Sequence, residues 1–467
     1  MKTTTHQPAI RIVSAEDKAE VRRIFSRRAE RLDEAERTVA PIIRAVVKEG
    51  DRALVRFAKR WDGFEGSSAS QLRVSAAEIA KARRMVSADF KLAVREAARN
   101  IREFCRLQMP KEWMRTTRPG VRVGQVIRPL ESVGCYIPGG RYPLPSTLLM
   151  TAIPAQVAGV ERVVVATPRA VPEILAAAGE LGIEEIYTVG GAPAIAAFAY
   201  GTRTIAPVSK IVGPGNAYVA AAKRMVSRDV AIDFVAGPTE VLLIAEDGEP
   251  RWLAADLLAQ AEHDVDSSAI LLTTSAKLAQ AIARAVSEQL PSLGENCPAA
   301  TSLRKNCAIV VVDDLDEAVS LANRFAPEHL SVPDGLALKK LRNAGSIFVG
   351  PYSPEAAGDY ASGPNHVLPT GGMATVRGGL SVLDFVKIIS VQQLSENGLR
   401  RLGPSIVTLA RSEGLEAHAR SVEIRFSPLN PSRALRPIVR GYGRRGDRKG
   451  AGADLIFETS RTSRRRM

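Results

Sequence analysis

The spacing of apolar and polar residues predicts helices over much of the first hundred residues. Residues 15–60 and 76–110 mix charged side chains with apolar ones that recur every three or four positions. That spacing gathers the apolar side chains on one face of a helix. From residue 122 to 138 the pattern changes to short β-like runs, so this helical part is expected to end before them.

Strand and helix patterns then alternate along the chain. Short runs rich in β-branched residues are each followed by a longer stretch with helical spacing. A repeated strand–helix order favours an α/β fold with parallel sheets flanked by helices. The predicted strands are 162–166, 185–189, 241–245, 269–274 and 307–312, and the predicted helices are 171–181, 192–200, 252–263, 276–290 and one that ends at 325.

The last part of the chain has less regular patterns. Residues 344–380 are rich in Gly and Pro, which predicts loops. Two final helices are predicted at 381–397 and 402–424. From residue 426 the chain is rich in Arg, Gly, Pro and Ser and has little periodicity, so we expect a disordered tail.

The length and composition bound the class of protein. A chain of 467 residues is long enough for two or three packed units. Its most apolar stretch, 144–166, is interrupted by prolines and charged residues, so no membrane span is expected. The N-terminus lacks the apolar segment of a secretory signal. The four cysteines, Cys105, Cys135, Cys297 and Cys307, show no CxxC spacing. This favours a reducing, cytoplasmic setting.

The net charge of +14 is typical of a nucleic-acid-binding protein, but its distribution argues otherwise. Residues 432–467 hold 11 of the 64 basic residues and 3 of the 50 acidic ones. The rest of the chain therefore carries a net charge of only +6. We expect no specific nucleic-acid site, although the basic tail is expected to bind polyanions weakly.

Histidine is scarce, and four of the five histidines lie in short polar segments. Gln260 and His263 are three residues apart on a predicted helix, so their side chains share a face. An amide oxygen and an imidazole nitrogen are both possible zinc ligands, and Asp359 and His418 are candidates for the others. A single histidine on a helix is more often structural, so spacing alone leaves both interpretations open.

Two further patterns suggest chemistry without establishing it. Glu328 and His329 are adjacent after a proline and could act as an acid–base pair, or could be an ordinary surface pair. The glycine-rich run 212–216 precedes a predicted helix, whose backbone amides could receive a pyrophosphate. It is not a GxGxxG fingerprint, so a plain tight turn is the alternative. Cys135 and Cys307 lie in apolar runs and are expected to be buried rather than reactive.

Taken in order, the polar segments resemble a known family over about residues 10–425. The chain resembles histidinol dehydrogenases in the motifs YIPGGRYPLPST, KIVGPGNAYVAAAKR, AGPTEVLLIA, LLAQAEHD, FAPEHLSV, GDYASGPNHVLPTGG, LSVLDFVKIISVQQLS and EGLEAHARSVEIR. The resemblance implies one Zn²⁺ per site and NAD as cofactor. It implies that the small-molecule substrate is histidinol, which is oxidised in two steps to histidine through a bound aldehyde.

The resemblance also assigns roles to individual residues. It implies that Glu328 and His329 are the catalytic acid–base pair. The implied zinc ligands are Gln260, His263, Asp359 and His418. The implied substrate contacts are Thr239, Gln260, His263, His329, Asp359, His366, Glu413 and His418. The implied NAD contacts are Tyr136, Asn216 and the position of Pro193.

The family resemblance further implies a homodimer with shared active sites and an aldehyde-dehydrogenase-like arrangement of two larger α/β domains. The expected division has a helical extension at 1–30 and an NAD-binding domain at 136–240. A domain with most zinc and catalytic residues is expected from 31–135 and 241–380, and a helical domain at 381–425 is expected to cross to the partner. A basic tail at 426–467 completes the chain.

Four departures from the family pattern leave alternatives open. Thr239 stands where a serine is usual, and Pro193 stands where a glutamine is usual, which removes a side-chain hydrogen bond to NAD. The RYPLPST loop and the tail also differ. The first alternative is a related dehydrogenase of another small alcohol, such as a sulfonated diol. The second is a zinc hydrolase, although a hydrolase needs no dinucleotide-binding turns.

Overall fold

The computed structural model describes residues 9–26, 32–139, 143–294 and 296–427. The chain divides into two compact units. The first consists of Met1–Arg115 and Val123–Gln392, and the second of Thr116–Arg122 and Gln393–Met467. Among the described residues, no helix is both long and apolar enough to span a bilayer.

One half of the first unit is built on a six-stranded sheet whose recorded strand pairs are all parallel. The strands, in spatial order, are β1 (Arg11–Ser14), β11 (Ala308–Val311), β10 (Ser268–Thr273), β9 (Glu240–Ile244), β12 (His329–Val332) and β13 (Ser346–Val349). Every residue of β9 is buried, and its side chains alternate between two hydrophobic clusters. Such a strand is covered on both faces, as parallel sheets require.

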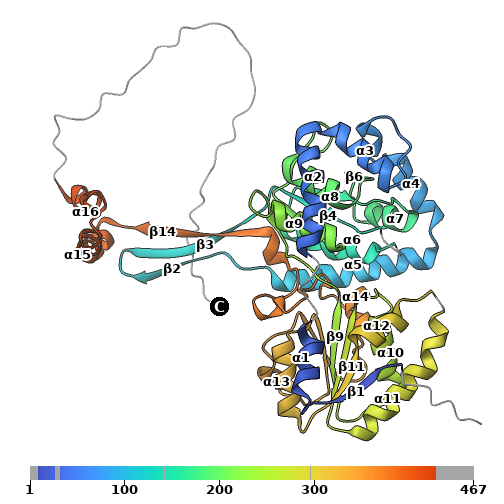
Figure 1. The fold of residues 1–467 in the computed structure, drawn as a ribbon. Coiled ribbons are helices and arrows are strands. Elements are labelled where there is room, and N and C mark those ends of the chain that lie inside the picture. The colour runs from blue at the N-terminus through green and yellow to red at the C-terminus, as the bar shows by residue number, and fades with distance from the viewer. Residues whose placement is uncertain (1–8, 27–31, 140–142, 295, 428–467) are drawn as a thin grey trace, which may run out of the picture. The chain divides into compact units, whose positions relative to one another are not determined.

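Helices cover both faces of this sheet (Figure 1). One face is covered by α10 (Pro250–Ala261), α11 (Ala276–Gln289) and α12 (Ala299–Asn306), and these helices pack with β9 residues 241 and 243. The other face is covered by α1 (Lys18–Ser26) and α13 (Leu315–Phe325), which pack with β9 residues 242 and 244.

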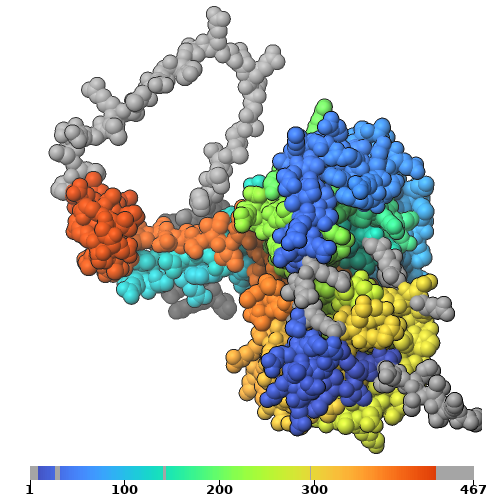
Figure 2. All heavy atoms as spheres, viewed as in Figure 1, coloured from blue at the N-terminus to red at the C-terminus, as the bar shows by residue number. Residues whose placement is uncertain are grey.

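The other half of the first unit has a five-stranded parallel sheet in the order β6-β5-β4-β7-β8. Its strands are β4 (Ser132–Tyr136), β5 (Arg162–Ala166), β6 (Ile186–Tyr187), β7 (Lys210–Val212) and β8 (Ala231–Ile232). One hydrophobic cluster joins it to α4 (Ala76–Met85), α5 (Ala88–Gln108), α6 (Pro145–Ala158) and α7 (Pro172–Glu180). A second joins it to α2 (Leu32–Glu49), α3 (Asp51–Trp61), α8 (Gly191–Tyr200) and α9 (Ala217–Val226). In Figure 2, α2 (blue) forms part of the surface of this half.

The two sheets confirm the predicted α/β fold, but the N-terminal part is divided differently from the prediction. β1 lies inside the predicted helical extension and pairs with β11, because its β-branched residues fit a sheet edge. Helices α2 to α5 were predicted to belong with residues 241–380. They pack instead on the five-stranded sheet, since their apolar faces match the clusters on its two sides.

A three-stranded sheet has the order β14-β3-β2, formed by β2 (Trp113–Arg118), β3 (Val121–Pro129) and β14 (Val386–Leu394). The predicted helix at 381–397 is therefore wrong. Val386, Ile388 and Ile389 are β-branched, and this run continues a strand rather than a helix. The predicted loop region 344–380 is also more ordered than expected, because it contains β13 and α14 (Glu355–Tyr360).

The described part of the second unit contains the α-helices α15 (Glu396–Ser412) and α16 (Glu416–Glu423), where the sequence predicts a single helix at 402–424. Ser395 caps α15, and its backbone N–H donates to the Gly120 carbonyl at 2.9 Å. A Cβ at Gly120 would lie 2.8 Å from the Gly398 nitrogen, and φ is +80°, so glycine is needed there. Of the predicted tail, residues 428–467 lie outside the described residues.

Short 3₁₀ turns complete the described structure. They are η1 (Ala69–Leu72), η2 (Leu290–Leu293), η3 (Leu338–Lys340), η4 (Met373–Thr375), η5 (Val382–Phe385) and η6 (Ile424–Phe426).

Candidate active site

A chain of hydrogen bonds joins three of the predicted site residues at the amino ends of β9 and β12. Thr239 precedes β9 and Glu328 precedes β12, and the two strands are neighbours. The Thr239 hydroxyl donates to Glu328 Oε2 at 2.5 Å, and the backbone N–H of Glu240 donates to the same oxygen at 2.9 Å. Gln260, near the end of α10, donates from Nε2 to Thr239 Oγ1 at 3.0 Å. The Thr239 hydroxyl therefore links Gln260 to Glu328, and its expected contact with the substrate stays a prediction.

His329, the first residue of β12, lies between two carboxylates. Its Nδ1 is 3.7 Å from Glu328 Oε2, and its Nε2 is 3.3 Å from Asp359 Oδ1 on α14. His329 is only 4% exposed and Glu328 only 6%, so both side chains lie in the protein interior, where charges are screened weakly. Among the described residues, His329 Nε2 is buried and has no partner with hydrogen-bond geometry.

Burial and charge shift the pKa values of this group in opposite directions. Burial raises the pKa of Glu328 above its usual range, so its proton is held more tightly than that of an exposed glutamate. Burial alone would lower the pKa of His329, but the Glu328 and Asp359 carboxylates outweigh burial and raise it to about 10. Burial alone would raise the pKa of Asp359, but the nearby His329 outweighs burial and holds that pKa below its usual range. A glutamate and a histidine tuned in this way can exchange protons with a substrate.

The structure brings His263, His329 and His366 near Asp359. His366 Nδ1 lies 2.8 Å from the Asp359 carbonyl oxygen, and its Nε2 lies 3.4 Å from Thr147 Oγ1 on α6. Burial lowers the pKa of His366. The charges of His263 and His366 both act on Asp359, which shows that all three groups face a common region.

The donor set suits zinc, although it is incomplete within the first unit. His263 Nδ1 lies 2.9 Å from the Ala259 carbonyl oxygen and donates to it, so Nε2 is the nitrogen left for a ligand. Gln260 bonds through its amide nitrogen, which leaves its oxygen for a metal. With Asp359 these side chains offer one nitrogen and two oxygens, a chemistry that Zn²⁺ accepts. Within the described ranges, however, no group of three or more His, Cys, Asp or Glu side chains is close enough to hold a metal.

Glu355 is a buried acid in this region that the sequence did not single out. It is 5% exposed, and neither carboxylate oxygen has a hydrogen-bond partner among the described residues. Burial, together with the nearby acids Asp359 and Asp256, raises its pKa to about 8 although His329 opposes the shift. The only sequence signal is its position four residues before Asp359 on the same helix.

The residues implied in NAD binding lie in the other half of the first unit. Tyr136, at the end of β4, is 4% exposed, and its hydroxyl accepts a bond from the Gly191 N–H at 3.0 Å. Pro193 is buried in α8 and offers no side-chain hydrogen bond. Asn216 caps α9, and its Oδ1 accepts bonds at 3.1 Å from the amides of Tyr218 and Val219.

The glycine-rich turns next to these residues have a clear structural cause. Gly213 has φ +117°, and a Cβ there would lie 2.2 Å from the Tyr136 carbonyl oxygen. Only glycine allows this approach of β7's end to β4. A hollow of about 370 Å³ is lined by Asp62, Pro168 and Thr188, close to the Gly190 turn. Asp62 accepts a bond from the Gly190 N–H at 2.9 Å, and burial raises its pKa to about 6.

The remaining predicted residues, Glu413 and His418, belong to the second unit. Glu413 ends α15 and His418 lies on α16, and both side chains are exposed. Their proposed part in the zinc and substrate site therefore stays a prediction. The cysteines fit their expected role, since Cys105, Cys135 and Cys307 are buried and all four are free.

Comparison with known proteins gives one consistent result. Residues 25–426 match the family model described as histidinol dehydrogenase. The chain is 51% identical over 400 residues to a histidinol dehydrogenase of Agrobacterium fabrum, covering 84% of this chain and 92% of that protein. It is 50% identical to one from Methanothermobacter thermautotrophicus, with coverage of 83% and 92%. The crystal structure of histidinol dehydrogenase from Elizabethkingia anophelis superposes with a TM-score of 0.86 at 37% identity, covering 90% of this chain and 98% of that one.

Proposed function

The chain belongs to the histidinol dehydrogenase family, and we propose that it oxidises L-histidinol to L-histidine with two NAD⁺ through a bound histidinaldehyde. The family is one of oxidoreductases in histidine biosynthesis, so the zinc hydrolase considered from the sequence is excluded. The observation that carries the proposal is the buried Glu328–His329 pair, with its carboxylate and imidazole 3.7 Å apart.

The pair supplies the proton transfers of both steps. In the first, His329 in its neutral form accepts the hydroxyl proton of the alcohol while the carbinol carbon loses hydride to NAD⁺. A cation held by Asp359 would favour that neutral form, because it would offset part of the carboxylate charge that raises the pKa of His329. In the second, Glu328 takes a proton from the water that adds to the aldehyde, and the hydrate loses hydride to a second NAD⁺. The Thr239 hydroxyl and the Glu240 amide both donate to Glu328, so they hold its carboxylate in place.

We propose one Zn²⁺ per site, held by Gln260, His263, Asp359 and His418. When bound, the metal would supply orientation by taking the amino and imidazole nitrogens of the substrate. Thr239, His366 and Glu413 would make further contacts with the substrate. His366 is supported in this role by its position between Asp359 and Thr147.

NAD would bind along the amino end of α9 and the neighbouring turn. Asn216 and Tyr136 are the proposed contacts, and Pro193 would contact the cofactor only through its apolar ring. The amides that precede α9 point to where a pyrophosphate is favoured by the helix dipole. Four free cysteines are compatible with the cytoplasm as the place of this reaction.

We also propose a homodimer in which Glu413 and His418 complete the partner's site. Mixing an inactive His418→Ala chain with an inactive Gln260→Ala chain tests this directly. Half of the dimers should be mixed, each with one intact site of two, so activity should recover to about a quarter of wild type. No recovery after verified subunit exchange would show that each chain uses its own residues.

An NADH assay with a panel of alcohols tests the substrate. Histidinol should give robust NADH production, whereas a sulfonated diol should give little. The reverse result would assign the chain to a related dehydrogenase on the same scaffold. His366 and the HVLPTGG segment favour histidinol, because the resemblance places them at the substrate.

A further inference from the structure

A buried lysine–aspartate pair lies beside the glycine-rich turn, away from the acid–base pair. Lys223 on α9 and Asp233 after β8 form an ion pair, and their side chains are 2% and 0% exposed. A buried ion pair is a costly way to stabilise a fold, since apolar residues of similar size often do as well. A local role other than stabilising the fold would explain why this ion pair is present.

Both members of the pair bind the same residue. Asp233 Oδ2 accepts a bond from the Gly213 N–H at 2.8 Å. Lys223 Nζ donates to the Gly213 carbonyl oxygen at 2.9 Å. The two polar groups of Gly213 are thus held from opposite ends of the pair, and both bonds are charge-assisted, which makes them stronger than neutral ones.

Gly213 is the residue whose conformation sets the direction of the following turn. Its φ of +117° lies in the left-handed region, and it has no Cβ to restrict it. A glycine can adopt many other conformations, so the two bonds help to select this one. The turn Pro214–Asn216 follows directly and leads into α9, so its amide groups take their direction from Gly213.

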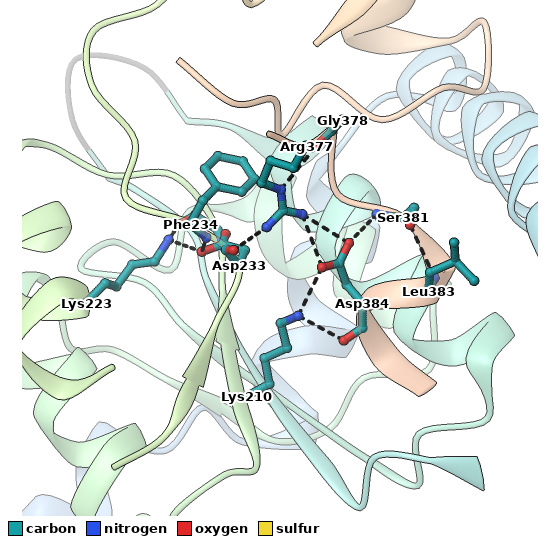
Figure 3. Close-up of polar contacts among 10 residues, drawn as sticks. Lys210, Lys223, Asp233, Phe234, Arg377, Gly378, Ser381, Leu383 and Asp384 are labelled. Atoms are coloured by element: carbon teal, nitrogen blue, oxygen red, sulfur yellow. Dashed lines mark hydrogen bonds and ion pairs between the residues drawn. The ribbon is translucent and has the colours of Figure 1, made fainter. Parts of the chain in front are cut away.

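A second set of contacts fixes the pair in place (Figure 3). The Arg377 guanidinium donates to the Asp233 carbonyl oxygen and to both carboxylate oxygens of Asp384, at 3.1 and 3.3 Å. It also lies 4.6 Å from the centre of the Phe234 ring. Lys210 donates to Asp384 Oδ1 at 3.1 Å. Asp233 is therefore held through its backbone as well as its side chain.

We propose that the Lys223–Asp233 pair is a positioning device that fixes the Gly213 peptide groups and so holds the Pro214–Asn216 turn ready for the pyrophosphate of NAD⁺ before NAD⁺ binds. The inference rests on the proposed function, since it takes this turn as the NAD⁺ site. Neither residue touches the reacting atoms, so the pair acts on NAD⁺ affinity rather than on the chemical step.

The test replaces the pair without leaving an unpaired buried charge. The double variant Lys223→Met/Asp233→Asn removes both charges and the Lys223 bond, while asparagine can still accept from Gly213. The dissociation constant for NAD⁺ should rise about tenfold or more, as expected for the loss of charge-assisted bonds. kcat at saturating NAD⁺, zinc per chain and histidinol affinity should stay within about twofold of wild type.

A matched control removes another ion pair of the same five-stranded half. Arg162, the first residue of β5, bonds Glu185 at 2.8 and 2.9 Å, whereas the bonds to Gly213 described above come from Lys223 and Asp233. Arg162→Gln/Glu185→Gln should leave NAD⁺ affinity within about twofold of wild type. An equal loss in the control, or wild-type NAD⁺ affinity in the folded double variant, would overturn the inference.

Amide exchange in the unaltered protein gives an answer even if the double variant fails to fold. The Gly213 amide should exchange slowly without NAD⁺ and gain little further protection when NAD⁺ is added. Fast exchange in the free protein, with protection only on binding, would show that the turn is not held in advance. If the wild-type protein binds no NAD⁺ at all, the proposed function fails, whereas slow Gly213 exchange would still show that the pair holds the turn.

Discussion

Two buried groups of charge in the first unit differ in how completely they are paired. Around Lys223 and Asp233, each side chain has an opposite charge and a backbone partner. Around His329, one imidazole nitrogen and both oxygens of Glu355 are buried and lack a hydrogen-bond partner among the described residues. The first group can only hold a shape, whereas the second has atoms left over for a substrate or a metal.

The incompletely paired group also has large pKa shifts. The pKa of His329 is raised to about 10 and that of Glu355 to about 8. Perturbed pKa values of this kind are typical of groups that take part in catalysis or bind metals. The comparison therefore separates a reactive site from a positioning site without reference to sequence motifs.

The largest expected effect is on turnover, at the incompletely paired group. Replacing His329 by Asn or Glu328 by Gln should lower kcat by about 10²–10⁴-fold, because each removes a group that moves a proton. Asp316→Asn is a matched control, since this acid forms a surface ion pair and is 75% exposed. Steady-state rates of the three variants decide. A His329→Asn or Glu328→Gln variant that retains more than a tenth of wild-type kcat would contradict the role proposed for that residue.

A large effect on stability is expected at the fully paired group. Lys223→Met alone leaves the Asp233 charge buried without its partner, which should cost about 3–5 kcal/mol of unfolding free energy. The double variant Lys223→Met/Asp233→Asn should recover most of that loss. Urea unfolding of both variants measures the difference. A single variant within 1 kcal/mol of wild type would mean that the pair is not buried as described.

A smaller effect of opposite sign is expected at Glu355. Its folded-state pKa of about 8 lies above the ordinary 4.5, so the folded state keeps a proton that the unfolded chain releases between these values. Stability of the metal-free protein should therefore fall as pH rises through this range. Glu355→Gln removes that loss and should stabilise by about 1–3 kcal/mol at pH 8.5, and by less at pH 5.5. Equal gains at both pH values would contradict the shift.

The smallest effect is expected outside both groups. Truncation after Arg425 removes the net charge of the basic tail but none of the residues described at either site. Turnover should stay within about twofold of wild type, while retention on heparin should weaken with the lost charge. A large loss of turnover in a folded dimer would show that the tail contributes to the site.

The sequence predicted the reactive group better than the positioning group. Glu328 and His329 are adjacent, and Gln260 and His263 share a face of a predicted helix, so local pattern marked them as candidates. Their roles came from the resemblance to the family, because spacing alone left a structural interpretation open. Glu355 was not predicted, because its importance lies in burial without a partner, which depends on how α14 packs. The Lys223–Asp233 pair joins residues ten apart through a third, Gly213, and no periodic signal marks it.

The sequence also predicted only part of the fold. The individual strand predictions correspond to five strands of the two parallel sheets, β5, β6, β9, β10 and β11. The sequence missed β1, β7, β8, β12 and β13, which are only two to four residues long and so give little pattern. Val386–Leu394 was misread as a helix because its second half, with Gln392 and Gln393, also suits a helix. Only pairing with β3 decides in favour of a strand. The packing of α2 to α5 could not be predicted from the sequence, since an amphipathic helix does not specify which sheet covers its apolar face.

The number of NAD⁺ reduced per histidinol consumed tests the central claim most directly. A stopped assay with limiting histidinol and excess NAD⁺, followed by quantification of histidine and of free aldehyde, gives this ratio. If Glu328 and His329 serve both oxidations in one site, about two NADH should form per histidinol, with histidine as the product and no free aldehyde. One NADH per histidinol with accumulating aldehyde, or no NADH from histidinol at all, would contradict the account.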